Sequence, residues 1–210
     1  MAGVVGHGDA FVLRDPNGIR PAFWHENDEF VVVASERPVI QTAFELKAED
    51  IQEIKPGHAL IIKKDGSVSE KQIRKPLEEN KCSFERIYFS RGTDVDIYNE
   101  RLELGRKVTA KALEAIDHDL RNSVFSFIPN TAETAYYGML KACDDYLSDV
   151  KFRKIRKLGK DITEEELSDI LSISTRAEKV MVKDAKLRTF ITQDDARDEM
   201  VAHVYDITYG

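Results

Sequence analysis

The sequence predicts a mixed fold in which an antiparallel α+β part comes first and an α/β part follows it. Three observations support this prediction. Short apolar runs separated by turn residues fill about the first 75 positions, as in antiparallel sheets. From Tyr98 onward, apolar residues recur at the helical period with charged residues between them. Residues 124–139 then show the order of an α/β layer, with an apolar strand, a turn and an alanine-rich helix.

The first part contains several strand candidates. The runs DAFVLRD and EFVVVAS are short and apolar, and the segment between them opens with Asp15-Pro16-Asn17-Gly18. This tetrapeptide predicts a turn, because proline presets φ and Asn-Gly accepts positive φ. A third run, HALIIKK, leads into an Asp-Gly pair and indicates a hairpin. These strands predict the edge of an antiparallel layer that is too small to close a sandwich by itself.

A short helix and a connector complete this part of the prediction. The run SERPVIQTAFEL is expected to be helical, with Ser35 as its N-cap and Pro38 in its first turn. Residues 76–97 are expected to form a connector. Within them, FERIYFS alternates bulky and polar residues and therefore predicts one more strand.

The second part alternates helices and strands. The run YNERLELGRKVTAKALEAIDHDL predicts a helix, SVFSFIP a buried strand, and AETAYYGMLKACDDYL a second helix. Thr163 and Glu166 have the spacing of a capping box ahead of a further short helix.

The final segments predict two strands, KVMVKD and RTFITQ, followed by a helix over DDARDEMVAHVYD. The basic run within residues 151–157 has two interpretations, an anion-binding patch or a solvated helix face, and we favour the solvated face.

Composition limits the class of function. The net charge of −7 and the pI near 5.4 argue against broad nucleic-acid binding, although a local basic pocket stays open. No apolar run approaches the roughly 20 residues needed to cross a bilayer, and the N-terminus lacks a secretory pattern. We therefore expect a cytoplasmic protein without a membrane partner. Cys82 and Cys143 are interpreted as reduced thiols, with a disulfide as the alternative.

The segment Pro129-Asn130-Thr131-Ala132-Glu133 is the first candidate site. Between a strand and a helix it supplies an amide, a hydroxyl, a carboxylate and the N–H groups of a helix start. Such groups suit a phosphate or a metal-bound phosphate, and the helix dipole favours the anion. The alternative is that Thr131 caps the helix. The segment lacks the glycines and the lysine of a P-loop.

Basic residues near the C-terminus form a second candidate. Arginine recognises phosphate with two parallel hydrogen bonds, and lysine acts as a point charge. The alternative is a set of surface charges balanced by nearby aspartates, unless these segments converge on the turn at 129–133. Neither a zinc ligand set nor a nucleophile beside a histidine is visible in the sequence. The basic residues are Lys183, Lys186, Arg188 and Arg197.

Six segments, in this order, resemble the amidophosphoribosyltransferase family. That family catalyses the first committed step of de novo purine synthesis. It joins a glutaminase domain of the N-terminal-nucleophile type to a type I phosphoribosyltransferase domain, where ammonia from glutamine displaces pyrophosphate from phosphoribosyl pyrophosphate. The segments are RDPNGIRPAF, SERPVIQTAFEL, IKPGHALII, CSFERIYFSRGTDVDIYNERLELG, FSFIPNTAETAYYGM and KLRTFITQ, and they cover nearly the whole chain.

The resemblance implies a domain organisation. Residues 1–75 correspond to the C-terminal edge of the glutaminase β-layer, residues 76–97 to a connector, and residues 98–210 to the first part of the phosphoribosyltransferase domain. The family's catalytic N-terminal cysteine and its ribose-phosphate loop are not among these residues. The chain therefore resembles an internal fragment, which we expect to be inactive alone.

The resemblance also implies roles for individual residues. The turn containing Asn130, Thr131, Ala132 and Glu133 matches the family's pyrophosphate loop, and Thr131 matches the position whose hydroxyl contacts Mg²⁺. The family usually has an acidic residue where Asn130 stands. The segment from Lys183 to Arg188 matches the flexible loop that folds over the substrate.

Cys82 matches a position that binds an iron–sulfur cluster in some members of the family. One thiolate cannot hold a four-iron cluster, so we expect no such cluster in this chain and interpret Cys82 as structural.

The parent protein's expected partners are phosphoribosyl pyrophosphate with Mg²⁺, glutamine, and further copies of the chain, because an incomplete parallel sheet has an unpaired edge. Two alternatives from other classes remain open. One is a non-catalytic module that binds phosphate or nucleotides for regulation. The other is an interaction domain without a ligand.

Overall fold

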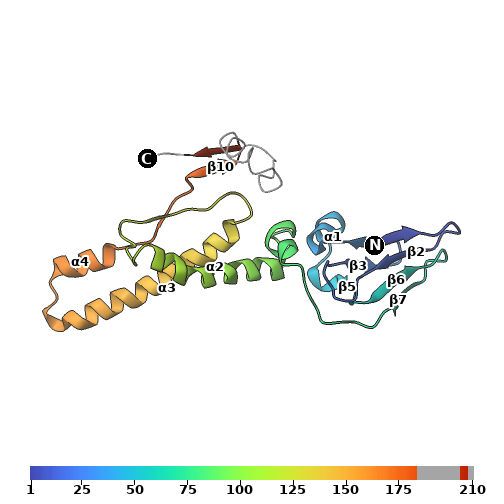
Figure 1. Ribbon diagram of the computed structural model, residues 1–210, viewed down its shortest axis with the longest axis horizontal. Coiled ribbons are helices and arrows are strands. Elements are labelled where there is room, and N and C mark those ends of the chain that lie inside the picture. The colour runs from blue at the N-terminus through green and yellow to red at the C-terminus, as the bar shows by residue number, and fades with distance from the viewer. Residues whose placement is uncertain (184–203, 208–210) are drawn as a thin grey trace. The chain divides into compact units, whose positions relative to one another are not determined.

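The computed structural model describes residues 1–183 and 204–207, and the chain divides into two compact units, Met1–Ile97 and Tyr98–Gly210 (Figure 1). The first unit is built mainly from strands and the second mainly from helices. This confirms the mixed fold class. No helix within the described ranges is long and apolar enough to span a membrane.

Two antiparallel sheets form the first unit (Figure 1). The four-stranded sheet has the order β1-β2-β6-β7 and the three-stranded sheet the order β4-β3-β5, which confirms the antiparallel prediction. Trp24, Ile54 and Leu60 form the buried core of this unit. The strands are β1 (Ala2–Val4), β2 (Ala10–Leu13), β3 (Phe23–Glu26), β4 (Val31–Ala34), β5 (Gln52–Glu53), β6 (His58–Ile62) and β7 (Val68–Gln72), with a short 3₁₀ turn η1 (Ala48–Asp50) before β5.

The predicted helix is α1 (Arg37–Phe44), but its predicted cap is wrong. Pro38 lies in the first turn as expected, whereas the N-cap is Glu36 and not Ser35. Glu36 has an extended backbone and makes no side-chain cap hydrogen bond, because its carboxylate lies 3.4 Å from Arg91 instead. The ion pair thus replaces the expected cap.

The strand predicted over FERIYFS is also wrong, since Glu85–Phe89 form a π-helical turn, η2. The winding brings Phe84 within ring-contact distance of Tyr88 and Phe89, at 5.8 and 5.5 Å between centroids. It also buries the carboxylate of Glu85, which lies 2.6 Å from the guanidinium of Arg20. An alternating strand pattern cannot make these contacts, because it places side chains four residues apart about 13 Å from one another.

The predicted connector is attached to the turn near Asp15. The backbone N–H of Leu77 donates to Pro16, at 2.9 Å, and the N–H of Cys82 donates to Ile19, at 3.0 Å. Arg37 holds Asp94 with two hydrogen bonds of 2.9 and 2.8 Å. These bonds account for the position of residues 76–97 within the first compact unit.

Three helices and two small sheets are described in the second unit. β8 pairs in parallel with β9, and β10 pairs antiparallel with β11. Residues of α2, α3 and β8 form one core of six buried residues, among them Leu113, Phe125 and Cys143. The elements are α2 (Val95–Ala115), β8 (Val124–Phe125), α3 (Glu133–Leu158), the 3₁₀ turn η3 (Gly159–Asp161), α4 (Glu164–Ser172), β9 (Arg176–Ala177), β10 (Met181–Lys183) and β11 (Tyr205–Ile207).

Two local predictions for this unit are confirmed, and a predicted strand is shorter than expected. The capping box is confirmed by two hydrogen bonds. The backbone N–H of Glu166 donates to the Thr163 hydroxyl at 3.2 Å, and the backbone N–H of Thr163 donates to the Glu166 carboxylate at 3.0 Å. The basic run lies on α3, and its residues 153, 154, 156 and 157 are exposed, as a solvated helix face requires. The strand predicted over SVFSFIP is shorter than expected and ends at Phe125.

Both cysteines are free thiols, so the disulfide alternative is excluded. The predicted strand RTFITQ and residues 194–203 of the last predicted helix lie outside the described residues. Tyr205 and Asp206, at the end of that helix prediction, lie in β11, and the prediction is wrong there. Backbone pairing with Lys183 and Val182 on β10 holds them in an extended conformation.

Candidate functional site

The candidate site is the turn that leads from β8 into α3. Phe125 ends the strand and Glu133 begins the helix. Pro129 is buried, whereas Asn130 is exposed and Thr131 is half-buried. The Pro129–Asn130 peptide bond is cis. The turn therefore exposes Asn130 to solvent, while Pro129 is held against the protein.

A buried hydrogen bond closes the base of this turn. The Tyr136 hydroxyl on α3 donates to the backbone carbonyl of Phe125, at 3.0 Å. The same carbonyl accepts from the N–H of Glu178, at 3.0 Å, and the Ser126 hydroxyl accepts from the N–H of Val180, at 3.4 Å. Burial raises the pKa of Tyr136. The strand end is thus connected both to the helix and to the segment after β9.

The helix start leaves donors available. Ala132 is the N-cap and makes no side-chain cap hydrogen bond. The N–H of Glu133 donates to Asn130, and the N–H of Tyr136 donates to Ala132. The N–H groups of the intervening Thr134 and Ala135 have no intrahelical acceptor, since the first turn of a helix offers none. These two groups lie at the positive end of a helix of 26 residues, where an anion is favoured.

The hydroxyl of Thr131 does not cap the helix. Within residues 1–183 and 204–207 it has no hydrogen-bond partner. The capping alternative is therefore not what the structure shows, and the hydroxyl is available to a ligand.

Glu133 is the acidic member of the site. Its carboxylate accepts a hydrogen bond of 2.9 Å from the Tyr137 hydroxyl, which raises the pKa of Tyr137. A carboxylate at this position repels a bare phosphate. It tolerates a phosphate whose charge is reduced by a bound cation.

The structure places only part of the second candidate. Lys183 is half-buried in β10, and its ammonium lies 5.7 Å from the ring centroid of Tyr205, a cation–π distance. Arg188 lies outside the described residues, together with Lys186 and Arg197. The convergence of this segment on the turn therefore stays a prediction.

The described part of the chain contains no cluster of three or more histidine, cysteine or acidic side chains able to hold a metal ion. Mg²⁺ takes few protein ligands when it binds together with substrate phosphates, and it keeps several waters. The Thr131 hydroxyl and the Glu133 carboxylate fit that mode. A cation at this turn would therefore arrive with its phosphate.

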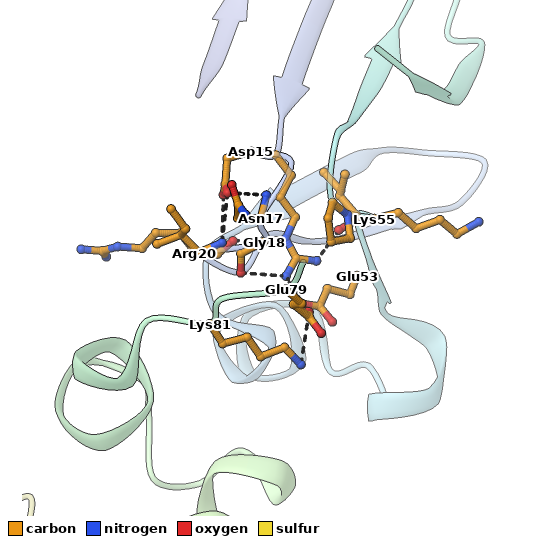
Figure 2. A network of polar contacts seen from close by, with 12 residues as sticks. Asp15, Asn17, Gly18, Arg20, Glu53, Lys55, Glu79 and Lys81 are labelled. Carbon is orange, nitrogen blue, oxygen red and sulfur yellow. Dashed lines mark hydrogen bonds and ion pairs between the residues drawn. The ribbon is translucent and has the colours of Figure 1, made fainter. Parts of the chain in front are cut away.

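The sequence interpretation missed one prominent polar network, which includes Asp15, Gly18, Glu53 and Glu79 (Figure 2). Arg14 contacts the last three of these residues. Arg14 is only 5% exposed, and its guanidinium donates to the carbonyls of Ile54 and Arg20. It also forms an ion pair of 2.8 Å with Glu53. Asp15 accepts from the backbone N–H groups of the turn that follows it. The network holds that turn, and the only signal in the sequence was an arginine beside an Asp-Pro-Asn-Gly turn.

Eight curated proteins that match the chain are all amidophosphoribosyltransferases. The protein of Pseudomonas aeruginosa is 33% identical over 145 residues, which are 64% of this chain and 28% of that protein. The protein of Lachancea kluyveri is 34% identical over 136 residues, which are 59% of this chain and 26% of that protein. The protein of Escherichia coli is 31% identical over 141 residues, which are 63% of this chain and 27% of that protein. No protein-family model matches the chain.

Solved structures share the fold. Glutamine phosphoribosylpyrophosphate amidotransferase from B. subtilis, complexed with ADP and GMP, has a TM-score of 0.57 and 22% identity over 95% of this chain and 36% of its own. A structure described as the allosteric regulatory enzyme of purine biosynthesis has a TM-score of 0.55 and 24% identity over 91% of this chain and 34% of its own. The chain spans about a quarter of the length of the curated relatives above. The similarity in sequence and in fold confirms the resemblance: this chain is related to a part of the amidophosphoribosyltransferases.

Proposed function

We propose that this chain is part of an enzyme that makes 5-phosphoribosylamine from phosphoribosyl pyrophosphate and glutamine, in the first step of de novo purine synthesis. The first unit would belong to the glutaminase domain and the second to the phosphoribosyltransferase domain. The names of the relatives support this enzyme over a regulatory module or an interaction domain. Mg²⁺, a cytoplasmic location and a homo-oligomeric state are further parts of the proposal.

The turn at residues 129–133 would hold the pyrophosphate group. The observation that carries this assignment is the helix start itself, which leaves the Thr131 hydroxyl uncommitted beside first-turn N–H groups. The N–H groups of Thr134 and Ala135 would donate to phosphate oxygens. The Thr131 hydroxyl and the Glu133 carboxylate would face the cation that accompanies them.

We expect binding to this chain alone to be weak. The turn offers few donors, so a dissociation constant on the order of millimolar, about 4 kcal/mol, is expected for magnesium pyrophosphate. Turnover is not expected, because the reaction needs a positioned ribose and a source of ammonia.

Calorimetric titration of magnesium pyrophosphate into Thr131→Val tests the assignment. Valine keeps the shape of threonine and removes its hydroxyl, so we expect the affinity to fall about fivefold, by roughly 1 kcal/mol. Thr175→Val is the matched control, because the Thr175 hydroxyl donates to Asp144, far from the turn in sequence. Equal binding by wild type and Thr131→Val, or anion binding only at residues 151–157, would contradict the assignment.

A further inference from the structure

The helices α2 and α3 cross (Figure 1). Gly105 on α2 lies against the backbone of α3, and Gly138 on α3 lies against the backbone of α2. A Cβ atom added to Gly105 would overlap the carbonyl oxygen of Ala135 and lie 2.8 Å from the backbone nitrogen of Met139. A Cβ atom added to Gly138 would overlap the carbonyl oxygen of Leu102 and lie 2.9 Å from its Cα atom. The neighbours are backbone atoms, which cannot move aside by changing a rotamer. Any side chain at either position must therefore push the two helices apart.

Other contacts keep the helices at this separation. The Thr109 hydroxyl on α2 donates to the Gly105 carbonyl, at 3.0 Å, and lies 3.4 Å from the Met139 carbonyl on α3. Further along the same pair of helices, Leu113 and Cys143 are buried in one core. The close approach at the glycines is therefore part of a continuous packed interface.

This close approach lies at the candidate site. Ala135, which faces Gly105, is the third residue of α3 and one of the two residues whose N–H groups are available to an anion. The next residue is Tyr136, whose hydroxyl donates to the backbone carbonyl of Phe125. Phe125 precedes the turn, so this bond connects α3 to the end of β8. A displacement of α3 at Ala135 would therefore displace the donors as well.

We propose that Gly105 and Gly138 are positioning residues for the pyrophosphate-binding turn at residues 129–133. This inference rests on the proposed function of that turn. The glycines touch no ligand. They let the backbones of α2 and α3 approach until the first turn of α3 is fixed in place, and that turn presents its N–H groups and the Glu133 carboxylate to magnesium pyrophosphate.

Gly105→Ala is the first test. Alanine favours helix more than glycine does, so local propensity predicts a more stable helix, whereas the packing predicts a displaced one. We expect magnesium pyrophosphate to bind about tenfold more weakly to this variant. Loss of one charge-assisted hydrogen bond lowers an affinity by about that factor. Calorimetry is performed at a temperature where circular dichroism shows the variant to be folded.

Leu113→Ala is the matched control, since it removes core volume from the same helix without adding atoms between the backbones. It should lower the melting temperature and leave the affinity for magnesium pyrophosphate within about twofold of wild type. Should Gly105→Ala not fold, Thr109→Val serves instead. It adds no volume, removes the hydroxyl contacts across the helix pair, and is expected to weaken binding about threefold.

Hydrogen exchange separates this proposal from the proposed function. If wild type does not bind magnesium pyrophosphate, the proposed function of the turn fails. The positioning role is then measured from the amide exchange of Glu133 and Tyr136, whose N–H groups are hydrogen-bonded at the helix start. Their exchange should be faster in Gly105→Ala than in Leu113→Ala. Equal exchange in the two variants, or binding by folded Gly105→Ala that equals wild type, would overturn the inference.

Discussion

At the residue scale, two neighbouring tyrosines near the turn at 129–133 have different environments. The Tyr136 hydroxyl is buried and connects α3 to the end of β8, whereas the Tyr137 hydroxyl is exposed and contacts Glu133. The sequence shows only two adjacent aromatic residues on a helix. Their separate tasks follow from the face of α3 on which each of them lies.

Tyr136→Phe and Tyr137→Phe form a matched pair for a stability measurement. Loss of the buried hydroxyl leaves the Phe125 carbonyl with one bond fewer, so Tyr136→Phe should lower the free energy of unfolding by about 1–2 kcal/mol. Tyr137→Phe should change it by less than about 0.5 kcal/mol, because its hydroxyl is exposed. Urea denaturation followed by circular dichroism measures both. Equal losses in the two variants would show that the bond to Phe125 does not hold the turn.

A second residue-scale prediction concerns the thiols. Cys143 is fully buried on α3, and burial raises the pKa of its thiol to about 11. Because the thiolate is the reactive form, Cys143 should not react with a thiol reagent in the folded protein at pH 8. Cys82 is half-buried and should react first. Mass spectrometry after brief alkylation measures this order, and early labelling of Cys143 would show that the core around it is open.

At the element scale, strands and helices are joined by polar residues that the hydrophobic pattern does not reveal. In the first sheet, Asp9 lies just before β2 and forms an ion pair of 2.6 Å with Lys63, just after β6. It also accepts from the backbone N–H of Lys64, at 3.0 Å. The ends of these two paired strands are therefore held by one carboxylate.

The Asp9 carboxylate should make the stability of the folded protein depend on pH. The hydrogen bond from Lys63 is the main cause that lowers the pKa of Asp9 from its ordinary value of 3.8. A group whose pKa is lower in the folded state contributes stability above its unfolded pKa and loses it as the pH falls through the folded value. Wild type should therefore be more stable than Asp9→Asn at pH 6, and the difference should shrink below about pH 4. Thermal unfolding at pH 6 and pH 2.5 measures it, and a difference that does not depend on pH would contradict the ion pair.

At the scale of the whole molecule, the chain divides into two compact units before Tyr98, where the sequence changes from strand-like to helical patterning. The first unit contains the buried Arg14 network of Figure 2. It also contains the chain's one tryptophan, Trp24, in its core. Trp24 fluorescence therefore reports on the first unit, while helical circular dichroism reports mainly on the second.

Arg14→Met should destabilise the first unit selectively. Methionine keeps the hydrophobic length but leaves the carbonyls of Ile54 and Arg20 without their donor, which should cost about 3 kcal/mol. The partly exposed Glu53 adds little to this figure. Trp24 fluorescence should shift to lower urea, and the helical signal should follow it only if the units unfold together. An unchanged fluorescence midpoint would show that the Arg14 network does not stabilise the first unit.

The sequence by itself determined the elements that depend on neighbouring residues. The antiparallel strands, the helix with Pro38 in its first turn and the capping box of Thr163 followed from local patterns, because alternation, proline geometry and cap spacing act over a few positions. The candidate turn could also be found, because a strand followed by polar residues and a helix is a local pattern. The role that we propose for it was suggested by a resemblance that depends on the order of six segments along the chain.

Only the tertiary structure decided the features that depend on distant contacts. FERIYFS became a π-helical turn because burial of Glu85 beside Arg20 outweighed its alternating pattern. The close crossing of α2 and α3 could not be predicted, since a glycine within a helix gives no sign of the backbone that will face it. The burial of Arg14 likewise depends on a carbonyl 40 residues away. Local patterns determine which conformations each segment prefers. Packing and charge pairing between distant segments then determine which of these conformations is adopted.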